Sequence, residues 1–223
     1  MASTQEIEGP WNSATIKVVK EPDDKIRVLE FFCSNFIQEE PTLKLLGSTE
    51  ELRHDLELMV RKMLDEELTL VAEEDGEVAA VWISYNNTDI GVANSAEGKL
   101  YLQILDDAEK AVDFGQVFGT SDYCTMFGVL VAPKFRRQGL ATELAKRSLA
   151  LFLQNGKTHT VIKCTSPFTR SMMVRLGFEE IGKLGYDQIV NEAGEKVFSE
   201  NELDPRLHYV TVYGKMEVVP LKL

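Results

Sequence analysis

Apolar and polar positions along the chain switch between the two-residue repeat of strands and the wider repeat of amphipathic helices. Residues 15–20 alternate between apolar and polar over most of their length, and residues 125–131 are almost continuously apolar, as in a strand that is buried on both faces. The pattern predicts strands at 15–20, 68–72, 78–85, 125–131, 160–164, 178–186 and 208–218, and helices at 22–36, 52–63, 99–114, 139–154 and 166–177. Strands that alternate with helices predict an α/β fold, with one mixed central sheet of about seven strands flanked by helices.

Short polar and glycine-containing segments mark the ends of these elements. Ser48-Thr49-Glu50-Glu51 has the form of a capping box, in which the serine hydroxyl accepts a backbone hydrogen bond at the start of a helix. Glu74-Asp75-Gly76 joins two strands as a hairpin turn, and Asn155-Gly156 suits the left-handed end of a helix. Because no repeat or low-complexity linker divides the chain, we expect a flexible N-terminal segment, 1–13, followed by a single domain over 14–223.

The composition of the 223 residues, 44% hydrophobic and 27% charged, is that of an ordinary soluble domain. The formal net charge of −12 disfavours nucleic acid and membrane surfaces as partners and weakly favours cationic substrates. The N-terminus lacks the apolar core of a signal peptide, and no stretch reaches the roughly 18 apolar residues of a membrane helix. Three widely spaced cysteines and three scattered histidines indicate neither disulfides nor a metal site. We therefore expect a cytoplasmic protein without metal, with a monomer as the simplest assembly.

The segment most informative about chemistry runs from Val129 to Ala141. An apolar strand ends there in a loop that leads directly into a helix, whose first backbone N–H groups lack partners and whose dipole favours an anion. Gly139 lets a ligand approach the backbone, and Arg136 and Arg137 add positive charge. This arrangement predicts a cradle for phosphate or pyrophosphate, with an ordinary strand–loop–helix turn as the alternative. The spacing disfavours both a P-loop and a Rossmann site.

Four segments resemble known acetyltransferases. Arg136-x-x-Gly139-x-Ala141 resembles the acyl-CoA-binding signature of the GNAT superfamily, and residues 173–178 resemble its C-terminal helix-to-strand junction. Residues 36–41, with Glu39-Glu40-Pro41, and residues 163–169 are similar to segments of the insect-type arylalkylamine N-acetyltransferases, the dopamine and agmatine N-acetyltransferases among them. The resemblance extends over about residues 15–218. It implies a sheet that splays between two neighbouring strands, with acetyl-CoA in the gap.

The resemblance also implies roles for individual residues. The strand would offer its backbone to pantetheine, and the loop and helix start would hold the pyrophosphate; the cofactor-binding residues are then Val129, Leu130, Val131, Arg136, Arg137, Gln138, Gly139, Leu140 and Ala141. The catalytic base of the family falls on Glu40. Its two catalytic serines fall on Thr165 and Thr169, which keep the hydroxyl and add a methyl group, and Ser166 is a neighbouring alternative.

The chemistry of acetyl transfer explains why such residues are needed. A primary alkylamine, with a pKa near that of lysine (~10.4), is protonated at neutral pH, so a carboxylate must accept its proton before the nitrogen can attack. A backbone N–H at the end of strand 125–131 can stabilise the oxyanion, and a threonine hydroxyl can protonate the departing thiolate. Without the resemblance, Glu40 would be interpreted as a solvated acidic residue, and the two threonines as residues that cap a helix or a strand.

The resemblance favours transfer of acetyl from acetyl-CoA to a small amine. The candidates are arylalkylamines such as tyramine, dopamine or serotonin, and agmatine or a polyamine. A protein or peptide N-acetyltransferase and a non-catalytic CoA-binding module are the alternatives. Cys164 is expected to be inert packing and the pair Met172-Met173 to be core, whereas Tyr186 either lines the amine pocket or fills a strand face.

Overall fold

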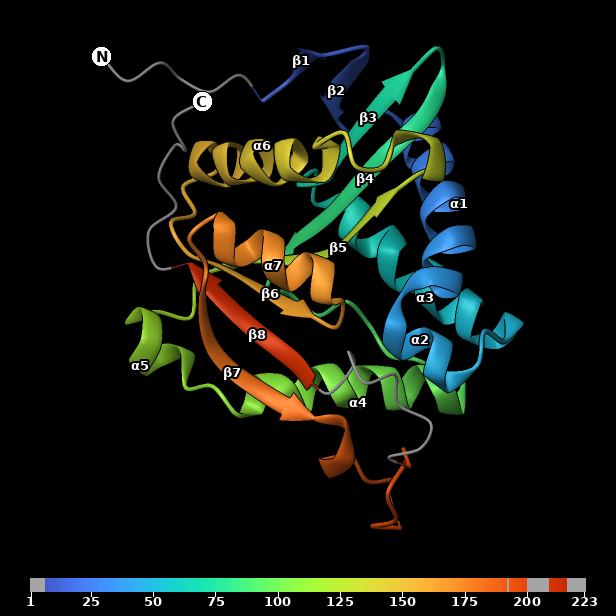
Figure 1. The fold of residues 1–223 in the computed structure, drawn as a ribbon, viewed down its shortest axis with the longest axis vertical. Helices are drawn as coiled ribbons and strands as arrows, with labels where there is room; N and C mark the ends of the chain where they lie inside the picture. Colours follow the sequence, from blue (N-terminus) through green and yellow to red (C-terminus); the bar gives the residue numbers. More distant parts are fainter. Residues whose placement is uncertain (1–6, 192, 200–208, 216–223) are drawn as a thin grey trace.

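The predicted strands all belong to one mixed sheet with helices on both faces (Figure 1). The computed structural model describes residues 7–191, 193–199 and 209–215. Within them the strands lie in the order β1-β2-β3-β4-β5-β6-β8-β7, with β5 and β6 as the parallel neighbours. These strands are β1 (Gly9–Trp11), β2 (Ala14–Val18), β3 (Leu70–Glu74), β4 (Glu77–Asn86), β5 (Cys124–Val131), β6 (Thr160–Cys164), β7 (Glu179–Gly185) and β8 (Tyr209–Lys215). The predicted α/β fold with a mixed sheet of about seven strands is confirmed.

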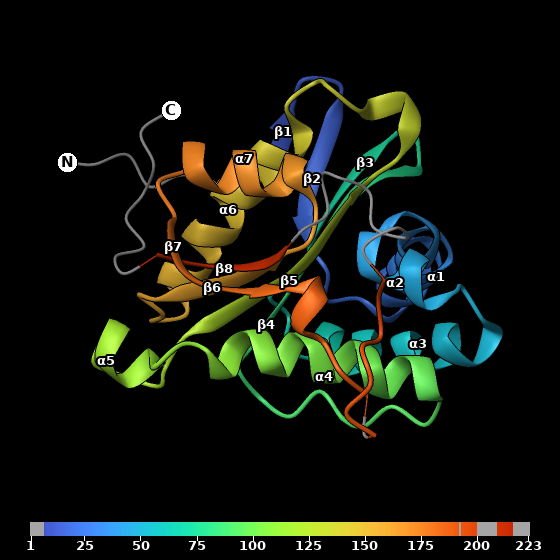
Figure 2. The ribbon, with the colours of Figure 1, turned by 60° about the horizontal axis from the view of Figure 1, so that its bottom comes forward.

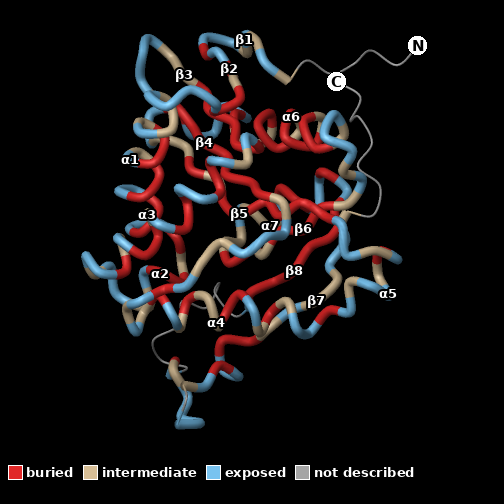
Figure 3. Tube along the Cα trace, turned by 180° about the vertical axis from the view of Figure 1, so that it is seen from behind, coloured by how far each residue is buried: buried red, intermediate tan, exposed pale blue. Residues whose placement is uncertain are grey.

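Helices cover both faces of this sheet. They are α1 (Pro22–Glu39), α2 (Pro41–Leu46), α3 (Glu50–Asp65), α4 (Ala96–Lys110), α5 (Phe114–Phe118), α6 (Leu140–Gln154) and α7 (Pro167–Arg175). Helices α6 and α7 pack on one face, and α1, α3 and α4 on the other, as Figure 2 shows. Because both faces are covered, the central strands are buried along most of their length (Figure 3), which explains the unbroken apolar run at 125–131. Among the described helices, none is both long and apolar enough to cross a membrane.

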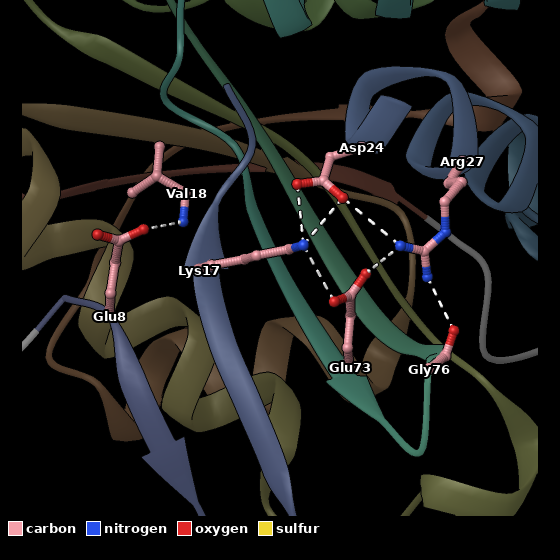
Figure 4. A network of polar contacts seen from close by, with 7 residues as sticks. All are labelled: Glu8, Lys17, Val18, Asp24, Arg27, Glu73 and Gly76. Carbon is pink, nitrogen blue, oxygen red and sulfur yellow. Dashed lines mark hydrogen bonds and ion pairs between the residues drawn. The ribbon is translucent and has the colours of Figure 1, made fainter. Parts of the chain in front are cut away.

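A network of charged side chains fixes the N-terminal end of α1 against β2 and β3 (Figure 4). Lys17 Nζ lies 2.8 Å from Asp24 Oδ2 and 3.0 Å from Glu73 Oε2, and Arg27 reaches the Glu73 carboxylate at 2.8 Å. Arg27 also donates to the Gly76 carbonyl, in the turn between β3 and β4, at 2.9 Å. Each pair is partly exposed and contributes little alone, but the shared partners orient α1, whose other end carries the predicted base.

The N-terminal hairpin extends the sheet into the range 1–13. Strand β1 pairs with β2, and the Glu8 carboxylate accepts a hydrogen bond from the Val18 N–H at 2.9 Å. Arg147 of α6 donates to the carbonyls of Gly9 and Pro10 at 3.2 Å each, and pairs with Glu143 at 2.8 Å. Residues 7–13 are therefore tied to both the sheet and α6, whereas their polar sequence alone predicts a flexible segment.

Some element boundaries differ from the predicted ones. The helix predicted at 99–114 begins at Ala96, where Ser95 caps it by accepting from the Gly98 N–H, and ends at Lys110. The capping role predicted for Ser48 was wrong: Thr49 Oγ1 accepts from the Leu52 N–H at 3.2 Å, and Ser48 donates to the Ile37 carbonyl instead. The short helices α2 and α5 have too few residues to give a periodic signal.

Candidate active site

A cavity of about 1220 Å³ opens where β5 and β6 separate. The two strands pair only from Cys124 to Met126 on β5 and from Thr160 to Ile162 on β6, and both continue beyond that pairing. The cavity lies in the resulting gap, between the junction of α1 and α2 on one side and the starts of α6 and α7 on the other. The predicted splay of the sheet is therefore present.

The end of β5 presents backbone groups to this cavity. The Ala132 N–H donates to the Ala79 carbonyl beside β4. Because backbone groups alternate sides along a strand, those of Val131 and Val129 face away from β4, toward the gap. Both residues line the cavity and are half-buried, and the Val131 carbonyl accepts from Arg136 Nε at 2.9 Å. A ligand lying in the gap can thus pair with β5 as a missing strand would.

The start of α6 has the uncapped first turn and the glycine on which the predicted phosphate cradle depends. Gly139 is the N-cap, in the left-handed region at φ 90°, and no side chain caps the first turn. Arg137 is also left-handed, at φ 63°. The free N–H groups of this turn therefore border the cavity, which Gly139, Leu140 and Ala141 line.

Arg136 spans the mouth of the cavity. Its Nη2 lies 2.6 Å from Glu39 Oε1, so the guanidinium joins the loop before α6 to the C-terminal end of α1. Both side chains are exposed by about two fifths, at 43% and 40%. The one predicted cofactor residue away from the lining is Gln138, which is exposed and whose amide donates to the Lys134 carbonyl at 3.2 Å. The other eight line the cavity.

Glu40 is buried at the junction of α1 and α2. It ends α1 and is the N-cap of α2, with Pro41 as the first residue of that helix. Its Oε2 accepts from the Leu43 N–H at 2.6 Å, as an N-cap carboxylate does. Its exposed fraction is 6%, and it lines the cavity. The Glu-Pro sequence therefore serves to hold this carboxylate at a helix start inside the molecule.

Thr165 meets Glu40 across the cavity. The hydroxyl of Thr165, just beyond β6, donates to Glu40 Oε1 at 2.6 Å, across 125 positions of sequence. Burial raises the pKa of the Glu40 carboxyl, and the hydrogen bonds from Thr165 and from the Leu43 N–H oppose that rise. Glu40 is thus a carboxylate whose affinity for a proton is raised by burial, within hydrogen-bond reach of a hydroxyl.

The remaining predicted hydroxyls lie nearby but do not bond to Glu40. Thr169 lines the cavity from α7, and no hydrogen bond links it to Glu40 in the part of the chain that the structure describes. Ser166 caps α7 by accepting from the Phe168 N–H at 3.3 Å, with Pro167 as the first helical residue. Of the three hydroxyls, Thr165 is the one that the fold brings to the carboxylate.

The α1 and α4 side of the cavity contains residues that the sequence did not single out. Phe36, Phe127, Tyr101 and Leu105 form an apolar wall, in which the rings of Phe36 and Phe127 lie 6.0 Å apart. Tyr101 and Leu105 are four residues apart on α4, so they share one helix face. Even where sequence periodicity predicts a buried face, as it does at Leu105, it cannot tell a core face from a cavity wall.

Three further predictions can be compared with the structure. Met172 and Met173 are buried in the core beneath α6, and Cys164 is buried, which raises the pKa of its thiol and keeps it unreactive. Tyr186 is fully buried, and its hydroxyl lies 2.6 Å from Thr42 Oγ1, two residues after Glu40. Tyr186 is thus not among the residues that line the cavity, and its hydrogen bond with Thr42 stabilises the start of α2. Among the described residues, no cluster of three acidic, His or Cys side chains could hold a metal ion.

The chain belongs to the GNAT acetyltransferase family, whose model matches residues 33–178. Among solved structures, arylalkylamine N-acetyltransferase 2 from Aedes aegypti is similar over 92% of this chain and 99% of its own, with 22% identity and a TM-score of 0.78. A mosquito arylalkylamine N-acetyltransferase-like 5b is similar over 91% and 99%, with 19% identity and a TM-score of 0.79. The polyamine N-acetyltransferase of Drosophila melanogaster, which forms N-acetylagmatine, is similar over 91% and 99%, with 16% identity and a TM-score of 0.77. At these identities the structures show a shared fold. A comparison with curated protein sequences finds no match.

Proposed function

We propose that this protein transfers an acetyl group from acetyl-CoA to the nitrogen of a small primary amine, with Glu40 as the general base. The observation that carries the proposal is the buried Glu40 carboxylate, 2.6 Å from the Thr165 hydroxyl, in a cavity at the splay of a GNAT sheet. Family members use acetyl-CoA as the acetyl donor, so the acceptor is what the site of this chain must specify.

The residues of the cavity fit acetyl-CoA. Val129 turns its backbone groups toward the gap, and Val131 turns its N–H there while its carbonyl is bonded to Arg136, an arrangement that suits the amides of pantetheine. The uncapped first turn of α6, with a glycine at its N-cap, suits a pyrophosphate. Arg136, Arg137 and Arg175 bring positive charge to the same lining, in a chain whose net charge is −12. Acetyl-CoA would supply the acetyl thioester.

Glu40 would prepare the amine for attack. The ammonium group of the acceptor is attracted to the carboxylate, which takes its proton directly or through a water molecule. The neutral nitrogen then bonds to the carbonyl carbon, and the carbon–sulfur bond breaks. Of the two protons that the ammonium gives up, one neutralises the thiolate and the other is released to water. Burial raises the pKa of Glu40, and this strengthens it as a base.

Thr165 would relay a proton to the sulfur. Its hydroxyl donates to Glu40, so once Glu40 has taken the first proton of the ammonium, Thr165 can pass its own proton to the departing sulfur and be reprotonated from the Glu40 carboxyl. The regenerated carboxylate then accepts the second proton of the nitrogen and releases it to water. Thr169, farther along α7, is proposed as a second hydroxyl of the site on the strength of the family resemblance. A backbone N–H at the end of β5 would stabilise the negative charge that develops on the carbonyl oxygen.

The acceptor is proposed to be an arylalkylamine such as tyramine, dopamine or serotonin, or agmatine or another polyamine. Solved structures similar to this chain include arylalkylamine and polyamine N-acetyltransferases. We also propose a monomer in the cytoplasm, where the three free, buried cysteines would stay reduced.

Thiol release from acetyl-CoA tests this proposal. The purified protein is incubated with acetyl-CoA and, separately, tyramine, dopamine, serotonin, agmatine, a polyamine and a panel of peptides. Turnover with small amines supports the proposal. Turnover with peptides alone would indicate a protein N-acetyltransferase, and a raised melting temperature with CoA but no turnover would indicate a non-catalytic CoA-binding module.

A further inference from the structure

Tyr101 is a buried phenol whose hydroxyl has no hydrogen-bond partner in the part of the chain that the structure describes. It lies on α4 with an exposed fraction of 3%, and it lines the cavity. No hydrogen bond joins its hydroxyl to another residue within the described ranges. The hydroxyl oxygen itself is not completely covered by protein atoms, so it remains accessible from the cavity. An unpaired buried hydroxyl is costly, and a ligand that pairs with it removes that cost.

The surroundings of Tyr101 are apolar. Phe36, Phe127 and Leu105 line the same wall, and the charged group with the largest electrostatic effect on the phenol is Glu40. Burial, together with Glu40 and Tyr186, raises the pKa of the Tyr101 phenol well above its usual range. The hydroxyl is therefore neutral at every physiological pH. It can donate or accept a hydrogen bond, but it cannot act as a counter-ion.

Apart from Glu40, the carboxylate among the described residues of the lining is already paired. Glu39 binds Arg136 at the mouth of the cavity, and Lys163, which also lines it, lies 3.1 Å from Glu109 Oε1. Among the described lining residues, Glu40 is left for the reacting ammonium. A second cation on the acceptor would thus meet a phenol and aromatic rings rather than a free carboxylate.

We propose that Tyr101 is a specificity-determining residue, whose hydroxyl binds a neutral polar group at the far end of the acceptor. This deepens the proposed function and rests on it: Glu40 fixes the amine end, the aromatic wall packs against the hydrocarbon part, and Tyr101 pairs with a ring hydroxyl. The favoured acceptor class is then the hydroxylated arylalkylamines.

Removal of one oxygen from either partner tests this pairing. Tyramine and phenethylamine differ only in the ring hydroxyl, and Tyr101→Phe removes only the phenol oxygen. Wild type should favour tyramine over phenethylamine in kcat/KM by about tenfold, the value of one buried hydrogen bond and its desolvation. Tyr101→Phe should abolish that preference by lowering the value for tyramine alone. Tyr123→Phe is the matched control, because this buried phenol just before β5 packs against Phe114 and Phe118 and lines neither this cavity nor the smaller one beside it, so it should leave the preference unchanged.

Each other outcome overturns the pairing. Equal losses for both amines in Tyr101→Phe would place the hydroxyl at the reacting nitrogen, and no loss for either would mean that the acceptor does not touch it. A wild type that acetylates both amines equally well refutes the specificity role while the proposed function stands. A wild type that acetylates neither these nor any other amine refutes the proposed function and the pairing with it. Melting curves of the three proteins establish that both variants are folded.

Discussion

Glu40 serves two purposes at once, because the carboxylate that would accept a proton also caps α2. Its removal tests both. Glu40→Gln keeps the size and an acceptor for the Leu43 N–H but cannot take a proton, so kcat/KM for amines should fall by roughly 10²–10⁴. Steady-state kinetics with saturating acetyl-CoA measure the loss. In wild type, kcat/KM should rise as pH rises through the pKa of Glu40, which burial places above its ordinary value of 4.5. A folded variant with near-wild-type kcat and an unchanged pH profile would contradict the role of base.

The melting temperature of Glu40→Gln at different pH values provides a control that does not depend on its activity. Because burial raises the pKa of Glu40, ionisation of the carboxyl is less favourable in the folded than in the unfolded protein. The wild type therefore loses stability as pH rises from the unfolded to the folded pKa of this group. Glu40→Gln has no charge to bury, so it should melt at a higher temperature than wild type at pH 7, with a smaller difference at pH 4. A less stable variant at pH 7 would mean that the cap outweighs the buried charge.

Thr165 can be separated from an ordinary packing threonine on the same strand segment. Thr165→Val keeps the shape and removes the proton donated to Glu40, so kcat should fall by about tenfold or more, whereas Thr165→Ser should be tolerated. Thr160→Val is the matched control, because that buried hydroxyl, at the other end of β6, donates to the Cys124 carbonyl at 2.9 Å. It should cost stability and leave kcat unchanged. Equal kcat in wild type and Thr165→Val would reduce Thr165 to a structural role.

The hydrogen bond between Thr165 and Glu40 shows what local sequence can and cannot predict. The resemblance alone names both residues, but nothing in their own segments shows that they meet across 125 positions. Tyr101 is the opposite case: the sequence does not single it out, and only the fold shows that this side chain of α4 is buried and borders a cavity. The local sequence pattern can predict which side chains are buried. A cavity, in contrast, forms where the buried faces of different elements do not pack against each other.

The first turn of α6 is the element on which cofactor binding is proposed to depend. Gly139→Asp places a carboxylate where a pyrophosphate is expected, so CoA should no longer raise the melting temperature. Gly156→Asp is the matched control: Gly156 is also left-handed, at φ 74°, follows the other end of α6, and has open space around it. Both variants bear similar backbone strain, of roughly 1 kcal/mol. Only Gly139→Asp should lose the CoA-induced shift, and a full shift there would place the phosphates elsewhere.

Elements with strong local signals were predicted well, and those set by tertiary contacts were not. The buried strand β5, the hairpin turn at Asp75 and Gly76, and the Ser166 cap of α7 all follow from residue types that few other conformations suit. Strand β1 has three residues and no alternation, and its position depends on contacts with α6. Such an element becomes stable only after the domain has formed, so its own sequence does not predict it.

The link between β1 and α6 also bears on the stability of the whole molecule. Glu143 and Arg147 are both buried, with side chains 9% and 7% exposed, and Arg147 satisfies two carbonyls of the N-terminal hairpin. Arg147→Met leaves the Glu143 carboxylate buried without its partner, so unfolding in urea should show a loss of about 3–5 kcal/mol. The double variant with Glu143→Leu should recover part of that loss. If the double variant is the less stable of the two, the charge pair is not what holds the hairpin.

The same hairpin places an optical probe beside the proposed phosphate site. The chain has two tryptophans: Trp82 is wholly buried in β4, and Trp11, on β1, lies 3.7 Å from where a side chain on Gly139 would begin. The fluorescence emission of Trp82 should therefore not change when a ligand binds at the start of α6, whereas the emission of Trp11 should change. In Trp82→Phe, titration with CoA should change the emission and yield a dissociation constant without any label. In Trp11→Phe the emission should stay constant while CoA still raises the melting temperature; a signal that persisted without Trp11 would have to originate in the core.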